Sequence, residues 1–390
     1  MKSALEGITA LDLSRYTAGS YAALLLAEQG VNCIKIEPKP NGKQHRQSEF
    51  ALFNRSKKSL VLDLEQTAGV ETLEHMVRQT DVLIEDFNPA KVRELKIGYK
   101  HLSKINPGLI YCSITSFGER GPLKNKKGGD GVVAAFAGSM RNQGGLNWPP
   151  VFVFLPLGSY SAAMLAAYGV SLALYAREFT HRSQKVDTSL LAGEIAMEAG
   201  AFIAAPIIAP VNIKQNIQQG VLPGYRLYQC KDSKWIMLAC GNSTFWNKCC
   251  MALNRVDLIS DLRFEGMPWA LKSLDARKIL TNILTDIFCS RESAYWLDLL
   301  LKNDVPCAPV NLREEFIEDP QVKQNGMIID IDDYYLGKMK QMGIPITLTD
   351  YPPQVKSPAP RYGQHSNEVL QAFGFQKREI TGLKKKGVIL

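Results

Sequence analysis

The stretch Gly7–Glu37, GITALDLSRYTAGSYAALLLAEQGVNCIKIE, decides the fold class. Its apolar runs Ile8–Leu13 and Cys33–Glu37 predict two strands, and the Ala- and Leu-rich segment Ala18–Gln29 between them predicts a helix. The same alternation continues with predicted strands at Ser59–Asp63, Val82–Glu85 and Leu109–Ser113 and predicted helices at Glu71–Arg78 and Pro89–Leu95. Because strands that alternate with helices build a parallel sheet covered by helices, the sequence predicts an α/β fold.

Such a sheet is of the Rossmann kind, with functional loops at the carboxyl ends of its strands. No Gly-x-Gly-x-x-Gly motif follows the first predicted strand, so a dinucleotide site is not indicated. From about Gly220 the pattern changes. Tyr225–Gln229 and Trp235–Ala239 predict a hairpin around Asp232-Ser233, and three helices follow at Phe245–Leu253, Ala276–Cys289 and Ala294–Leu301.

The composition sets limits on the class of protein. A chain of 390 residues predicts two lobes, and 46% hydrophobic with 22% charged residues is typical of a soluble globular protein. No uninterrupted apolar run reaches the roughly 18 residues of a membrane span, and no signal peptide opens the chain, so we expect a cytoplasmic protein. The eight cysteines and five histidines form no ligand-like spacing, so neither a metal site nor a nucleic-acid module is predicted.

A polar side chain begins a long predicted helix in the stretch Val151–Leu190. An apolar run ends in Pro156-Leu157-Gly158, Ser159 follows at the turn, and an Ala-rich segment continues to about Arg177. The first turn of a helix offers unpaired N–H groups to an anion. Ser159 is therefore a candidate nucleophile, although a serine at this position also commonly caps a helix.

The same stretch resembles the active-site segment of the class III CoA-transferases, the CaiB/BaiF family. The matching positions are Gly158-Ser159, Gly169, Ala173-Leu174, Arg177-Glu178 and Gln184–Asp187. Further similarities run in order along nearly the whole chain, among them Asn54–Ser59, Asp81–Phe87, Asp304–Val310 and Gly363–His365. The resemblance implies a Rossmann-like large domain with an inserted smaller α+β domain, in an interlinked homodimer. It places the N-terminal part of the large domain at residues 1–205, a linker at 206–224, the small domain at 225–318, and a return linker with the C-terminal part of the large domain at 319–390.

The resemblance also implies a reaction, with one departure. In the family an aspartate attacks an acyl-CoA thioester and relays CoA to an acceptor carboxylate, but here Ser159 occupies its position. Our leading hypothesis is acyl transfer through Ser159, with Asp130 as its base. Two alternatives stay open: a CoA-transferase that uses another carboxylate such as Asp130, and a non-catalytic protein that binds acyl-CoA or an acyl carrier.

The substrate-binding positions carry over unevenly. A CoA thioester is the implied substrate, with no permanently bound cofactor. The implied contacts are Arg15, Tyr16, Thr17 and Ala18 after the first strand, Lys57 and Lys127 near the phosphates, and Asp86 and Phe87 beside the pantetheine. Thr17, Asp86 and Glu94 stand where relatives often have Gln, Asn and Arg. The acyl group and its acceptor are not identified by the sequence.

Overall fold

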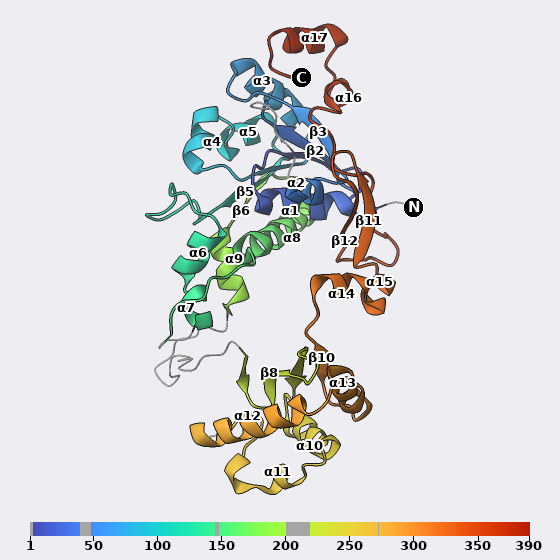
Figure 1. The fold of residues 1–390 in the computed structure, drawn as a ribbon. Helices are drawn as coiled ribbons and strands as arrows, with labels where there is room; N and C mark the ends of the chain where they lie inside the picture. Colours follow the sequence, from blue (N-terminus) through green and yellow to red (C-terminus); the bar gives the residue numbers. More distant parts are fainter. Residues whose placement is uncertain (1–2, 40–47, 145–147, 200–218, 272) are drawn as a thin grey trace. The chain divides into compact units, whose positions relative to one another are not determined.

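The computed structural model describes residues 3–39, 48–144, 148–199, 219–271 and 273–390 (Figure 1). They fall into two compact units. The large unit draws on Met1–Met140, Phe152–Val211 and Gln321–Leu390, and the small unit on Arg141–Val151 and Asn212–Pro320. Residues 141–151 thus group with the small unit, whereas we had placed them in the large domain. The predicted linker 206–224 lies outside the described residues as far as residue 218.

A six-stranded parallel sheet forms the centre of the large unit, as predicted. Its order is β3-β2-β1-β4-β5-β6. The strands are β1 (Thr9–Asp12), β2 (Asn32–Glu37), β3 (Lys58–Val61), β4 (Val82–Glu85), β5 (Ile110–Thr115) and β6 (Gln184–Ser189). In this doubly wound order the chain reverses its direction across the sheet between β1 and β4, and that reversal is where ligands bind in open α/β sheets. Strand β6 was not predicted, because its sequence QKVDTS is mostly polar.

Helices cover both faces of this sheet (Figure 1). On one face lie α1 (Thr17–Glu28), α8 (Leu157–Thr180) and α9 (Leu190–Met197). On the other lie α3 (Thr67–Val77), α4 (Pro89–Leu95), α5 (Tyr99–Ile105), α16 (Ser366–Ala372) and α17 (Lys377–Lys385). The helices α2 (Ser48–Phe53), α6 (Asp130–Ala137) and α7 (Ser139–Gly144) complete the first half of the chain. Alternate residues of β1, β2, β4 and β5 enter the two cores, as the pleat requires.

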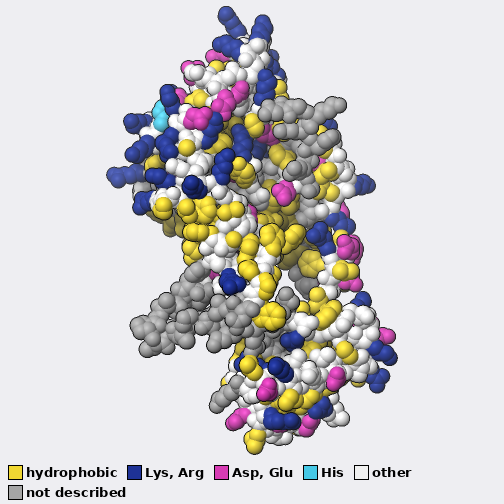
Figure 2. Space-filling model, turned by 60° about the vertical axis from the view of Figure 1, so that its left-hand side comes forward, with side chains coloured by type: hydrophobic (Ala, Val, Ile, Leu, Met, Phe, Trp, Pro, Cys, Tyr) yellow, Lys and Arg dark blue, Asp and Glu magenta, His cyan; other side chains and the backbone are white. Residues whose placement is uncertain are grey.

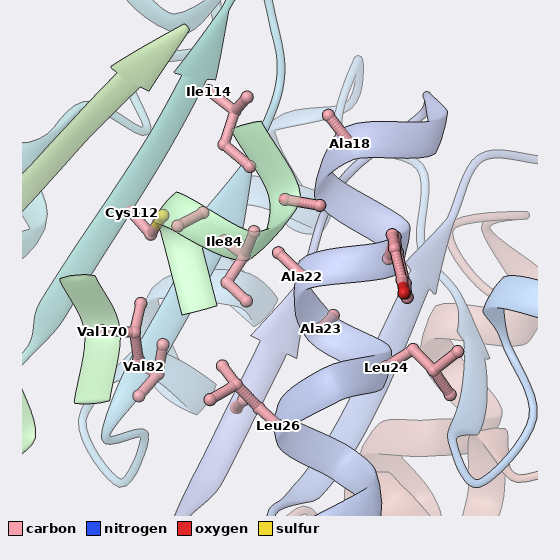
Figure 3. Close-up of a cluster of buried hydrophobic side chains, with 14 of the residues drawn as sticks. Ala18, Ala22, Ala23, Leu24, Leu26, Val82, Ile84, Cys112, Ile114 and Val170 are labelled. Carbon is pink, nitrogen blue, oxygen red and sulfur yellow. The ribbon is translucent and has the colours of Figure 1, made fainter. Parts of the chain in front are cut away.

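Small side chains let α1 approach the sheet and α8 closely. Ala22 and Ala23 of α1 and Ala162, Ala163 and Ala166 of α8 are all buried in one cluster, part of which Figure 3 shows. By length and mean hydropathy α8 is apolar enough to cross a membrane, which the search for an uninterrupted apolar run did not anticipate. However, 56% of its most apolar window is buried inside the fold, and a core helix meets the same two criteria.

The small unit has its own sheet and core. Four antiparallel strands lie in the order β10-β9-β8-β7: β10 (Cys307–Pro309), β9 (Trp235–Ala239), β8 (Tyr225–Gln229) and β7 (Gly220–Leu222). The predicted hairpin of β8 and β9 is confirmed with the same bounds. Around the sheet lie α10 (Ser243–Ala252), α11 (Asp257–Ser260), η2 (Leu262–Phe264), α12 (Leu274–Cys289), α13 (Ser293–Lys302) and α14 (Arg313–Glu318).

The return segment from about residue 319 contains regular structure that we did not predict. It contains α15 (Pro320–Gln324) and an antiparallel hairpin, β11 (Ile328–Asp333) with β12 (Gly337–Met342). Half of IIDIDD is aspartate and GKMKQM carries two large apolar residues, so no strand pattern stood out. The buried Arg55 fastens the hairpin by donating to the Gln341 side chain at 3.0 Å and to the Met342 carbonyl at 2.6 Å.

Candidate active site

A cavity of about 1030 Å³ opens in the large unit where the strand order reverses. The loops that follow β1 and β4 form one wall, and further lining comes from α2, the end of β5, the residue 124–130 loop and the start of α8. Every predicted site residue except Lys57 lines it: Arg15, Tyr16, Thr17, Ala18, Asp86, Phe87, Lys127, Asp130 and Ser159. The fold thus brings together four segments that are far apart in the sequence, at the position typical of ligand sites in this architecture.

Asp86 joins the two loops at the reversal. Its Oδ1 accepts the backbone N–H of Arg15 at 2.7 Å, and its Oδ2 accepts that of Tyr16 at 2.9 Å. Burial raises the pKa of Asp86 to about 6, although these two hydrogen bonds and the Lys35 ammonium pull it down. Asp86 lines the cavity as predicted, but its carboxylate is turned toward the backbone of the first loop. An amide could accept through only one atom, so the Asp in place of Asn has a structural use here.

Lys57 lies inside the fold and not in the cavity. Its ammonium donates to Asp12 Oδ2 at 2.8 Å, to the Ser20 carbonyl at 2.8 Å and to Asn54 Oδ1 at 3.0 Å. These three bonds use all three protons of the ammonium, and the side chain is buried. The predicted contact of Lys57 with a substrate phosphate is therefore corrected: Lys57 neutralises Asp12 beneath the first loop.

Ser159 and Asp130 form a close pair on the cavity wall. The Ser159 hydroxyl donates to Asp130 Oδ2 at 2.7 Å, and the Ser159 backbone N–H donates to Asp130 Oδ1 at 2.7 Å. Ser159 is buried, whereas Asp130 is half-buried and so more open to the cavity. The side chain of Asp130 caps the start of α8 from the start of α6, so the hydroxyl of Ser159 does not itself cap the helix. Sequence reasoning named both residues, but not their contact.

A basic loop borders the same cavity. Lys124 and Lys126 lie beside the predicted Lys127 and line the cavity with it. Among the residues that the structure describes, no carboxylate forms an ion pair with these three ammonium groups. The sequence KNKK before Gly128-Gly129 was the available signal for the two additional lysines. Together they place cationic charge on the route to Asp130, as a phosphorylated ligand requires.

Sequence reasoning missed Glu194, on the far side of the same helix start. It is buried on α9, and it was detectable only as a single acid in the apolar helical sequence LLAGEIAM. No cluster of three or more histidine, cysteine or acidic side chains suited to a metal occurs in the described ranges.

The sequence profile of CoA-transferase family III matches residues 5–366. The chain belongs to this family. It is 27% identical over 397 residues to the succinyl-CoA:glutarate CoA-transferase of Mus musculus, across 99% of this chain and 90% of that protein. Over 429 residues it is 27% identical to the formyl-CoA:oxalate CoA-transferase of Escherichia coli O157:H7, across 100% of each. A crystal structure of a CaiB/BaiF family protein from Brucella suis superposes with a TM-score of 0.80 at 25% identity, across 96% and 100% of the two chains.

Two departures of this family III CoA-transferase from the motif pattern have local explanations. Glu94, where an Arg is often found, does not line the cavity and pairs with Lys91 at 2.8 Å on an exposed surface of α4. His181, where a glycine is usual, ends α8 in the left-handed conformation at φ 52°. A glycine takes that conformation without strain, so the histidine there introduces local backbone strain.

Proposed function

We propose that the protein transfers CoA from an acyl-CoA thioester to a carboxylate and that Asp130 supplies the attacking carboxylate. One observation carries the proposal: both oxygens of Asp130 are held at 2.7 Å by Ser159, the residue at the position of the family's aspartate, on the wall of the cavity. The names of the mouse and E. coli relatives support CoA transfer as the reaction class. This chemistry was the first alternative to our leading hypothesis.

A carboxylate at this position allows the whole relay without a proton transfer. Asp130 attacks the thioester carbonyl, the C–S bond breaks, and CoA thiolate leaves behind a mixed anhydride. The thiolate then attacks the Asp130 carbonyl, which releases the first acid and forms an enzyme-bound thioester. An acceptor carboxylate repeats the two steps in the opposite direction, leaves as the new CoA ester and restores Asp130.

Ser159 has a supporting role in this scheme and a direct one in the alternative. A serine nucleophile would pass its proton to a base, and Asp130 Oδ2 at 2.7 Å is the group placed to receive it. The product of that route is a serine ester, which is much less reactive than an anhydride. We therefore favour Asp130 as the nucleophile, and retain acyl transfer through Ser159 as the second candidate because the hydrogen bond has the geometry that it needs.

Trapping the covalent intermediate separates the two routes. The protein is incubated with a panel of acyl-CoA esters, reduced with borohydride and mapped by peptide mass spectrometry. An Asp130 thioester is reduced to homoserine, whereas a Ser159 ester appears as an acyl mass on the serine peptide. We expect the homoserine at position 130, its absence in Asp130→Asn together with a loss of several orders of magnitude in turnover, and its retention in Ser159→Ala.

The contrary results are equally distinct. An acyl group on Ser159 that disappears in Ser159→Ala would replace our proposal with the serine route. Binding of acyl-CoA without any adduct or turnover would favour the non-catalytic alternative. Glu94→Gln is the matched control, because it neutralises an exposed acid outside the cavity.

We further propose that the protein is a homodimer and that α8 contributes to the interface. Five large apolar side chains spaced by three or four residues are exposed along this helix: Met164, Tyr168, Leu172, Tyr175 and Phe179. Figure 2 shows hydrophobic side chains gathered on the face of the large unit where α6, α8 and α9 lie. A contiguous apolar area of this kind is typical of a surface that a partner covers, and the family resemblance supports a second copy of the chain as that partner.

A further inference from the structure

Two carboxyl groups lie close to the first turn of α8, both near Gly158. A Cβ atom added at Gly158 would lie 3.3 Å from Asp130 Oδ1 and 3.4 Å from Glu194 Cγ. Asp130 accepts the backbone N–H of Ser159, and the backbone N–H of Gly158 lies near the Glu194 carboxyl. The start of the helix is thus close to two different acids.

Glu194 is held tightly in this place. A Cβ atom at the preceding Gly193 would lie 2.6 Å from the Gly158 carbonyl oxygen and 2.9 Å from the Ala162 nitrogen, so α9 contacts the backbone of α8 directly. On its other side, Glu194 Oε2 accepts the hydroxyl of Ser139 at 3.0 Å. Glu194 is only 1% exposed, and water therefore cannot solvate a charge on it.

One oxygen of Glu194 has no donor. Among the described residues, Glu194 Oε1 is buried without a hydrogen-bond partner, and so is Glu198 Oε2 one helical turn later. The charged neighbours of Glu194 are both acids, Glu198 on α9 and Asp130 on α6, while α7 presents the uncharged Ser139 and α8 a backbone N–H. A buried carboxylate with an unsatisfied oxygen and two acidic neighbours is unfavourable, whereas a bound proton removes the charge and the repulsion from those neighbours.

We propose that the folded protein keeps a proton on Glu194 to higher pH than the unfolded chain does, and that Glu194, as a positioning residue, sets the first turn of α8, which carries Ser159 beside Asp130. The catalytic half of this inference rests on the proposed function, because it needs Asp130 to act as the nucleophile. The protonation of Glu194 is independent of the proposed function.

The pH dependence of thermal unfolding tests the proton without any assay of activity. Burial raises the pKa of Glu194 above the usual glutamate range, the Ser139 bond lowers it, and Glu198 and Asp130 raise it further. Because the folded pKa lies above the unfolded one, the neutral carboxyl favours folding, and that contribution is lost as the pH rises from 4.5 through the folded pKa. The uncharged Glu194→Gln protein should therefore gain in melting temperature relative to the wild type as the pH rises across this window.

The reverse slope would overturn the proposal, since an ionised Glu194 that stabilises the helix start would make Glu194→Gln less stable as the pH rises. A difference that does not change with pH would overturn it too, because it would show no proton linked to this residue. Glu94→Gln, at an exposed carboxyl, provides the control for any general effect of removing one negative charge.

The rate of CoA transfer tests the positioning role. Glu194→Ala should lower kcat/KM by about tenfold or more at every pH, because α8 loses the group that fixes its first turn. In the wild type, ionisation of Glu194 should lower kcat/KM as the pH rises. Glu194→Gln should restore kcat/KM and abolish this decrease at high pH. A Gln variant as slow as the Ala variant, or one that keeps the decrease at high pH, would contradict the role. If the wild type transfers no CoA, the proposed function fails. The melting experiment still shows whether Glu194 is protonated in the folded protein.

Discussion

Asp12 shows how a single buried charge shapes the first loop of the site. It lies at the end of β1, fully buried, between the ammonium groups of Lys35 at 3.2 Å and Lys57 at 2.8 Å. Burial alone would raise its pKa, but the two lysines and their hydrogen bonds hold the pKa at about 2. Lys35 also donates to the carbonyl of Ser14, so this cluster supports the loop that lines the cavity.

We predict that Asp12→Asn destabilises the protein by about 3 kcal/mol, because it leaves two buried ammonium groups without their counter-charge. The folded pKa lies below the ordinary value, so the carboxylate stabilises the fold above pH 3.8 and loses that effect as the pH falls toward 2. Urea unfolding over this range should show an acid-dependent component of about 2 kcal/mol in the wild type alone. Equal acid dependence in both proteins would contradict this account.

At the scale of secondary structure, the contact between α8 and α9 positions the site. It depends on glycine, because the backbone of α8 occupies the space that a side chain at Gly193 would need. Gly169 on α8 has a similar contact, with a Cβ position 2.7 Å from Val186 Cγ1 of β6. These two glycines fix α8 against the segments on either side of the turn between β6 and α9, and thereby fix Ser159.

Gly193→Ala should cost about 1–3 kcal/mol and lower activity, since α9 must move away from the first turn of α8. Gly382→Ala is the matched control on α17, where no atom lies within 4 Å of the added carbon. There the substitution should stabilise the protein by about 0.5–1 kcal/mol through helix propensity. Thermal unfolding and turnover of both variants are the measurements. A Gly193→Ala protein with full stability would show that the helices have room.

At the scale of the whole molecule, Arg55 joins segments that are far apart in the chain. Its guanidinium pairs with Glu28 at 2.6 Å and donates to the β11–β12 hairpin, nearly 290 residues later. Arg55→Met should destabilise by about 3–5 kcal/mol, because Glu28 is left buried and unpaired. Amide exchange should accelerate in residues 328–342. Lys58→Met, which removes an exposed pair with Glu368, should cost at most about 1 kcal/mol.

The exposed apolar side of α8 gives a prediction for assembly. Sedimentation should give about twice the chain mass of 43.3 kDa. Replacing both Tyr168 and Leu172 by Glu should shift the protein toward the monomer, whereas Lys278→Glu on the small unit should not. A wild-type monomer would remove the dimer proposal. Association of that monomer with lipid vesicles, lost in the Glu variants, would show that a membrane covers the helix instead.

Local pattern alone determined much of this protein. The alternation of strands and helices predicted the parallel sheet, the β8–β9 hairpin kept its predicted bounds, and the turn before a long helix pointed to Ser159, whereas Asp130 was named from the family resemblance. The features predicted from pattern depend on neighbouring residues, whose periodicity is visible in the sequence. Only the tertiary structure decided that Asp130 contacts Ser159, that Lys57 turns inward and that Glu194 flanks the helix start. Such contacts join segments that are far apart in the chain, and packing rather than periodicity selects them.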